Sequence, residues 1–199
     1  MAEVNTNAAQ LVISRLDATI RVKQGILDSE CISQVIAAAA AMVASLRSGG
    51  KVLFFGNGGS SMDAGHLAAE LSGRFYRDRP GLAGISLSDS TAAMTAIAND
   101  YSYDNVFARQ VQALGKSGDV AVGLTTSGNS RNVVEALRVA NEIGMYTVVL
   151  TGQAGGKVVD AADVCIRVPS DDTPRIQEAC MHLGHTICEL VEQEMFPET

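Results

Sequence analysis

A helix that carries titratable side chains follows a glycine-rich turn in this 199-residue chain. The stretch 56–75 reads GNGGSSMDAGHLAAELSGRF. At about 100° per residue, Asp63, His66 and Glu70 fall on one flank of the predicted helix, and His66 and Glu70 can converge on one atom. An imidazole and a carboxylate in this arrangement suit proton transfer, and the alternative is an ordinary His–Glu pair on a solvated flank.

A second turn, TTSGNS at 125–130, follows a predicted strand and opens a predicted helix. It combines the hydroxyls of Thr125, Thr126, Ser127 and Ser130 with the backbone N–H groups of a helix N-terminus, which together suit a dianionic phosphate. Because the turn holds no lysine and no Walker spacing, a phosphate monoester fits better than a nucleoside triphosphate. The alternative is an N-cap with ordinary turn residues.

The glycine-rich turn itself, GNGGSS at 56–61, allows a ligand to approach the backbone closely. Its glycines stand at 56, 58 and 59, which is not the G-x-G-x-x-G spacing of a dinucleotide site. A dinucleotide is therefore not favoured.

The last predicted helix, 173–195, has two buried faces. Its core face is defined by Ile176, Cys180, Leu183, Ile187 and Leu190. Gln177 and His185 lie off that stripe, and Met181 and Cys188 lie between them in projection. A subunit interface would explain a second, partly apolar face.

A histidine, a glutamate and a phosphate cradle together suggest proton transfer on a sugar phosphate. Aldose–ketose isomerisation needs a base that carries a proton between C1 and C2, and an acid–base partner at the oxygens. A carboxylate and an imidazole have suitable pKa ranges when burial tunes them.

The elements that position these residues alternate between strand and helix. Strands are expected at 51–55, 82–88, 119–126, 146–152 and 163–169, and helices between them at 59–73, 90–98, 105–114, 130–144 and 173–195. This alternation predicts an α/β fold with a five-stranded parallel sheet flanked by helices, a flavodoxin-like three-layer sandwich. Ligands then bind at the carboxyl ends of the strands, after Phe55, Ser88, Thr126 and Thr151.

Two further helices, 6–27 and 29–48, precede the first strand. Val12, Leu16 and Ile20 recur at helical spacing in the first, and the second is rich in alanine. The pair either clamps a partner subunit or covers the sheet. The expected organisation is one domain over 1–199, with a helical pair at 1–48 used in oligomerisation and an α/β core at 49–199.

Composition excludes several classes of protein. A net charge of −7 argues against a general nucleic-acid or anionic-membrane binder. The four cysteines form no Cys-x-x-Cys pair and are expected to be small buried hydrophobic residues in a reducing compartment. Without a signal peptide or a membrane-length apolar run, the protein is expected in the cytoplasm, away from membranes.

Four motifs resemble one family, the sedoheptulose 7-phosphate or phosphoheptose isomerases of the sugar isomerase (SIS) domain superfamily. They read GNGGSSMDAGHLAAEL, AIANDYSYDNVFARQV, TTSGNSRNVVEAL and RIQEACMHLGH, and the resemblance covers nearly the whole chain. It implies conversion of sedoheptulose 7-phosphate to D-glycero-D-manno-heptose 7-phosphate, the first step of nucleotide-activated heptose synthesis. It also implies a homotetramer with active sites between subunits.

The resemblance also implies roles for individual residues. Glu70 would be the base and His185 its acid–base partner. Substrate contacts would come from Asn57, Gly58, Gly59, Glu70, Asn99, Asp100, Thr125, Thr126, Ser127, Ser130 and Gln177, with the hydroxyls at 125–130 on the phosphate. One zinc ion per subunit would be bound by His66, Glu70, Gln177 and His185.

Two details qualify this expectation. Glutamine is an uncommon zinc ligand, and Gln177 and His185 lie about 12 Å apart along their helix, so long side chains would have to bridge that distance. Gly184 is unusual inside a helix and costs about 1 kcal/mol relative to alanine.

Two other functions remain open on the sequence alone. A tetrameric relative that binds the bacterial replication initiator shares the AIAND stretch, the GNSR run and a C-terminal Phe196-Pro197, but lacks the base and the last histidine. An isomerase or sensor of another sugar phosphate is the second alternative. Glu70 and His185 favour the isomerase.

Overall fold

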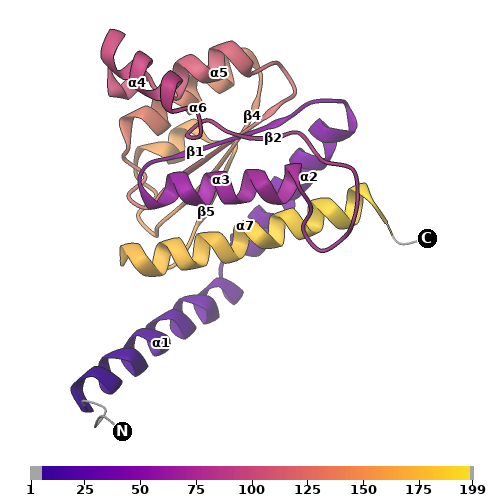
Figure 1. Cartoon of the computed structure of the whole chain (residues 1–199). Coiled ribbons are helices and arrows are strands. Elements are labelled where there is room, and N and C mark those ends of the chain that lie inside the picture. The colour runs from indigo at the N-terminus through magenta and orange to yellow at the C-terminus, as the bar shows by residue number, and fades with distance from the viewer. Residues whose placement is uncertain (1–5, 198–199) are drawn as a thin grey trace, which may run out of the picture.

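Five parallel strands form one sheet at the centre of the computed structural model, which describes residues 6–197 (Figure 1). The strands are β1 (Val52–Gly56), β2 (Gly84–Ser86), β3 (Val120–Thr125), β4 (Tyr146–Thr151) and β5 (Val164–Arg167). Their order, β2-β1-β3-β4-β5, is the flavodoxin-like order, so the predicted α/β fold is confirmed. The ends of the predicted domain, residues 1–5 and 198–199, lie outside the described residues.

Helices cover both faces of this sheet (Figure 1). One face packs against α2 (Cys31–Arg47), α3 (Gly59–Ser72) and α7 (Thr173–Met195). The other packs against α5 (Ala108–Leu114), α6 (Arg131–Ile143) and the 3₁₀ helix η2 (Gly156–Ala161), with α4 (Thr91–Asp100) and the 3₁₀ helix η1 (Tyr103–Asn105) beside them. Because both faces are covered, β1 and β3 are buried along their whole length and read as continuous apolar runs.

The strand register aligns the carboxyl ends that carry the predicted turns. Gly56 of β1 pairs with Leu124 of β3, and Thr125 of β3 pairs with Thr151 of β4. The turns after β1 and β3 are therefore neighbours at one edge of the sheet, as the sequence predicted.

Several element boundaries differ from the prediction. The expected strand 82–88 is shortened to β2, an edge strand. The expected helix 105–114 is shortened to α5, which begins at Ala108, because the chain turns at Val106 and Phe107 and buries both side chains completely. The 3₁₀ helix η1, which ends at Asn105, precedes this turn. The 3₁₀ helix η2 was not predicted.

The two N-terminal helices do different things. The alanine-rich α2 covers the sheet and packs against α7. In contrast, α1 (Thr6–Leu27) extends away from the sheet at the lower left of Figure 1. It is anchored by polar contacts, because the Thr19 hydroxyl donates to Glu178 (2.7 Å) and Arg175 donates to the Arg15 carbonyl (2.8 Å). Six of its large apolar side chains are half exposed or more: Leu11, Val12, Ile13, Leu16, Ile20 and Leu27. In contrast, Ile26 is buried in the core and Val22 packs against it.

No single described helix is long and apolar enough to cross a membrane. The bent pair of α1 and α2, which meet at 74°, reaches that threshold by length and composition.

All four cysteines are free, and Cys31, Cys180 and Cys188 are buried as expected of small apolar residues. Burial raises the pKa of the Cys180 and Cys188 thiols to about 12, so neither is a reactive thiolate at neutral pH.

Candidate active site

Two parallel helices, α3 and α7, carry the titratable residues side by side on one face of the sheet (Figure 1). Each helix packs against the rest of the fold through a stripe of buried residues. The stripe consists of Ala64, Leu67, Ala68 and Leu71 on α3 and of Ile176, Cys180, Leu183 and Ile187 on α7.

Gly184 allows α3 and α7 to approach closely. A Cβ atom there would lie 2.8 Å from both Cδ atoms of the buried Leu67 side chain, which occupies the space that a side chain at 184 would need. This contact explains the glycine inside a helix. It also brings together the neighbours of these two residues, His66 and His185.

His66, Glu70 and His185 form one cluster between the two helices. The Nε2 atoms of His66 and His185 lie 2.9 Å apart, and His66 Nε2 lies 3.0 Å from Glu70 Oε1. The His66 side chain is 51% exposed and that of Glu70 is 21% exposed, so the cluster is open to the surface. The two helices therefore bring the base and the acid–base partner predicted from the sequence to one place.

The donor atoms of this cluster fit a metal ion. One ligand atom from each of the three residues lies within 4.8 Å of the others. Two ligands on a tetrahedral zinc ion with bonds of about 2.0–2.1 Å are separated by about 3.3–3.4 Å, and catalytic zinc sites often have three protein ligands of these types. The structure thus contains a possible metal-binding triad.

Gln177, the fourth expected ligand, lies eight residues, or about two helical turns, before His185 on α7. Its Nε2 atom occupies the space beside Gly59, 2.6 Å from where a Cβ would be. It also lines a small cavity with Asp63, Thr125 and Thr126, so the cavity links α3 and α7 to the end of β3. Burial raises the pKa of Asp63, and the nearby His66 partly opposes that rise.

The hydroxyl-rich turn after β3 has the geometry of an anion cradle. The Thr125 and Ser130 hydroxyls are 3.1 Å apart, and the Asn129 backbone N–H donates to the Ser127 hydroxyl (3.2 Å). Ser130 is the N-cap residue of α6, but its side chain makes no capping hydrogen bond. The first N–H groups of α6 therefore remain available to an anion.

The glycine-rich turn is fixed by residues that the sequence analysis missed. The Asn57 and Asn132 side-chain amides exchange two hydrogen bonds of 2.8 Å, and the Tyr103 hydroxyl donates to Asn57 Oδ1 (2.9 Å). Gly58, the next residue, has a φ of 56° that favours glycine. Asn132, at the second position of α6, is buried. The signal in the sequence that could have found it was a polar amide at a strand–helix turn.

Asn99 and Asp100 end α4, and both are exposed. Asn99 donates to the Asp100 carboxylate (2.9 Å), and α4 has no buried residue. Within residues 6–197, no hydrogen bond or ion pair links either side chain to α3 or α7. Their substrate role stays a prediction.

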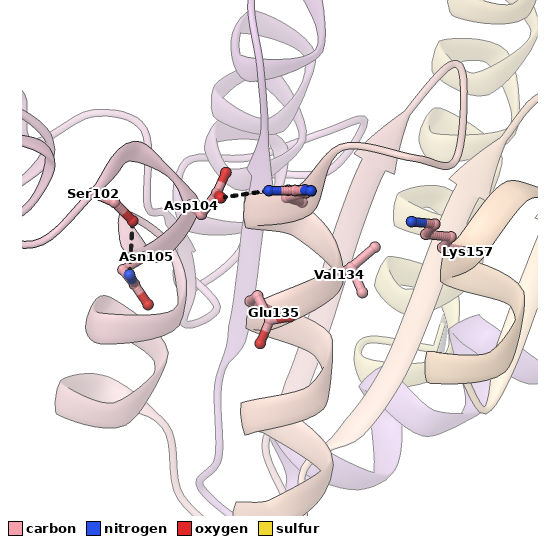
Figure 2. A pocket seen from close by; sticks show the side chains of 7 residues that line it. Ser102, Asp104, Asn105, Val134, Glu135 and Lys157 are labelled. Atoms are coloured by element: carbon pink, nitrogen blue, oxygen red, sulfur yellow. Dashed lines mark hydrogen bonds and ion pairs between the residues drawn. The ribbon is translucent and has the colours of Figure 1, made fainter.

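A separate hollow of about 390 Å³ lies beside the first turns of α6 (Figure 2). Asp104, labelled in Figure 2, pairs with Arg131 at 3.6 Å, while Glu135 and Lys157 add one further charge of each sign. Because the charges are mixed, the hollow favours an anion less than the hydroxyl-rich turn does.

The sequence and the structure both match known proteins. The SIS domain family model matches residues 18–152. The phosphoheptose isomerase of Thermodesulfovibrio yellowstonii is 49% identical over 180 residues, or 90% of this chain and 89% of that relative. The solved phosphoheptose isomerase of Neisseria gonorrhoeae has 42% identity and a TM-score of 0.87, covering 92% of this chain and 99% of that one. That of Francisella tularensis has 36% identity and a TM-score of 0.88, covering 94% and 98%.

The fold and the family match define the class, an SIS domain protein with a hydroxyl-rich turn after β3 and a His–Glu–His cluster. Within that class, the chain belongs to the phosphoheptose isomerases, and the resemblance read from its motifs is confirmed. The roles of the individual residues are proposals, taken up next.

Proposed function

We propose that this protein converts sedoheptulose 7-phosphate to D-glycero-D-manno-heptose 7-phosphate, the first step of nucleotide-activated heptose synthesis. The observation that carries the proposal is the His66–Glu70–His185 cluster between α3 and α7. The turn that opens α3 lies beside the hydroxyl-rich turn after β3 at the carboxyl edge of the sheet. Membership of the phosphoheptose isomerases supports the same reaction.

Glu70 is the base in this proposal. Its carboxylate removes a proton from C1 of the ketose and returns it to C2, which leaves the aldehyde at C1. His185 moves a second proton between the oxygens on C1 and C2, so that no net proton is gained or lost. A positioned acid–base group of this kind contributes about 10²–10⁴-fold to a rate.

The substrate is held at its other end by the cradle. Thr125, Thr126, Ser127 and Ser130 bind the phosphate with the first N–H groups of α6. Asn57, Gly58 and Gly59 face the sugar, and Gln177, Asn99 and Asp100 supply further contacts.

One zinc ion per subunit is the proposed cofactor, with His66, Glu70, Gln177 and His185 as its ligands. The triad geometry supports three of these ligands. When bound, zinc would polarise the oxygens of the substrate as a Lewis acid.

The proposed reaction is tested with purified protein and sedoheptulose 7-phosphate in a coupled assay, with added zinc and after chelation. Turnover that is lost in Glu70→Gln supports the isomerase. Absence of turnover in the wild type under both conditions would contradict it.

The metal site is tested by measuring zinc content and zinc affinity. His185→Gln should lower the affinity by about 10-fold or more, because it removes a ligand. His182→Gln is the matched control, since His182 lies on the same helix and is exposed. Equal zinc affinity in both variants would remove His185 from the ligand set.

We also propose a homotetramer with active sites between subunits, located in the cytoplasm. The exposed apolar side chains of α1 support a partner surface, and the openness of the cluster leaves room for a second subunit. Free cysteines suit a reducing compartment. Light scattering on Leu16→Glu should show a smaller species than the wild type, whereas an unchanged mass would contradict a role for α1.

The initiator-binding adaptor is not favoured, because relatives that are 44–52% identical are named phosphoheptose isomerases. Turnover of sedoheptulose 7-phosphate in the test above also separates the proposed function from that of an isomerase or sensor for another sugar.

A further inference from the structure

The loop 73–80 between α3 and β2 contains a buried arginine that closes the end of α3. Arg79 donates to the backbone carbonyls of Glu70 (2.7 Å), Leu71 (2.7 Å) and Gly73 (3.2 Å). The last carbonyls of a helix have no partner within the helix, so this guanidinium satisfies three acceptors at the end that carries Glu70. The Arg79 side chain is only 2% exposed.

Glu192 on α7 holds the same arginine and the same loop. Its carboxylate lies 3.0 Å from Arg79 Nε and accepts the backbone N–H groups of Phe75 (3.2 Å), Tyr76 (2.9 Å) and Arg77 (3.1 Å). Its side chain is also 2% exposed. Burial acts to raise the pKa of Glu192, but these hydrogen bonds outweigh it and lower the pKa, so the group is a carboxylate at neutral pH.

This ion pair connects the two helices that carry the cluster. Glu192 follows His185 by seven residues, about two helical turns, so both lie on one side of α7. Arg79 is bonded to the backbone of Glu70 itself. The Phe75 ring, in the same loop, lies nearly parallel to the His185 ring with centroids 5.7 Å apart. The Arg79–Glu192 pair therefore contacts α3, α7 and the loop whose Phe75 packs against His185.

From these contacts we infer that Arg79 and Glu192 are positioning residues, which fix the separation and orientation of Glu70 and His185 during isomerisation. Neither is placed against the reacting atoms. The inference rests on the proposed roles of Glu70 and His185. A displacement of about 1 Å in a reacting group can reduce a rate by about 10²-fold, so a rigid link of this kind has a measurable effect.

A second buried ion pair provides the matched control. Lys51 pairs with Asp119, whose side chain is 3% exposed and which also accepts the backbone N–H groups of Lys51 and Lys116 at 2.9 Å each. This pair stands at the start of β1 and β3, at the sheet edge opposite the predicted site. Asp119 resembles Glu192 in burial and in accepting backbone N–H groups, although Lys51 is more exposed than Arg79, at 22% against 2% of the side chain. No hydrogen bond or ion pair of the described residues links the Lys51 and Asp119 side chains to α3 or α7.

The experiment compares Glu192→Gln with Asp119→Asn in the full-length protein. Both should lower the melting temperature, because each removes the charge of a buried carboxylate and leaves its cation without a counter-ion. Only Glu192→Gln should lower kcat, by about 10-fold or more, with KM changed less than about twofold. An unchanged kcat in folded Glu192→Gln, or an equal loss in both variants, would overturn the inference.

Arg79→Lys gives a second test, because it keeps the positive charge beside Glu192 while removing the planar fork that reaches the α3 carbonyls. This milder variant should fold and show a reduced kcat at unchanged zinc content, and a wild-type kcat would overturn the inference. If the wild type itself fails to turn over sedoheptulose 7-phosphate, the proposed function fails instead. The two failures are thus distinguishable.

Discussion

The two strand–helix turns at the carboxyl edge share a topology but differ in chemistry. The turn after β1 is rich in glycine and opens α3, which carries Asp63, His66 and Glu70. The turn after β3 is rich in hydroxyls and opens α6, whose first turn adds Arg131 and the buried amide Asn132. Under the proposed function, this difference separates two tasks: α3 carries the residues that move protons, and the N-terminus of α6 binds the phosphate.

The largest expected effect comes from the proton-moving helix. Glu70→Gln keeps the size of the side chain but removes the base, so kcat should fall by about 10²–10⁴-fold while phosphate binding persists. Steady-state kinetics and inorganic phosphate titration measure the two quantities. Glu142→Gln, an exposed change on α6, should keep wild-type kcat. Near wild-type turnover in Glu70→Gln would end the base assignment.

A smaller effect is expected at the anion-binding turn. Ser130→Ala removes one hydroxyl that faces the phosphate, and a hydrogen bond to a charged group contributes about 1.5–3 kcal/mol, or about 10–100-fold in binding. KM should therefore rise with little change in kcat. Ser117→Ala, an exposed serine before β3, is the control. A fall in kcat at constant KM would show that the two turns do not divide the work in this way.

The smallest effect is expected at the bridge between the turns, the hydrogen bonds that join Asn57 after β1 to Asn132 of α6 and to Tyr103. Tyr103→Phe removes the hydroxyl that donates to Asn57 while the Asn57–Asn132 amide pair remains, so KM should rise by only a few fold, about 1 kcal/mol. Tyr101→Phe is matched to it, because Tyr101 is equally exposed and its hydroxyl meets Arg109 instead. If both variants bind substrate alike, the turns act without this bridge.

Much of the fold could be predicted, because each strand is a short apolar run between helices with clear periodicity. The errors of the prediction were limited to the bounds of a few elements. The edge strand β2 was overestimated because Leu82 and Leu87 are apolar for packing reasons outside the ladder. The break at Val106 and Phe107 depends on burial against α5 and α6, which no single-sequence pattern encodes.

The site was predictable where spacing within one helix decides it, as for His66 and Glu70. Their contact with His185 depends on how closely α3 approaches α7. In the sequence, Gly184 was noted only as an unusual glycine inside a helix. Arg79 and Glu192 were missed because two charged residues far apart in sequence look like surface residues until the fold buries them together. Asn99 and Asp100 were named by motif matching, and their substrate role stays a prediction, because the described hydrogen bonds join their side chains only to each other.

The helix α1 also has a consequence for how the protein reaches its final state. Most of its large apolar residues are exposed, although Ile26 near its C-terminal end is buried in the core and Val22 packs against that core, and its hydrogen bonds to α7 are polar. The sheet with its two covering layers therefore holds most of the chain's buried surface without it. Refolding should then proceed in two stages, a unimolecular collapse of the α/β body followed by a slower step whose rate rises with protein concentration. If α1 is covered only when subunits meet, as proposed, the speed of assembly rather than the speed of folding controls when activity first appears.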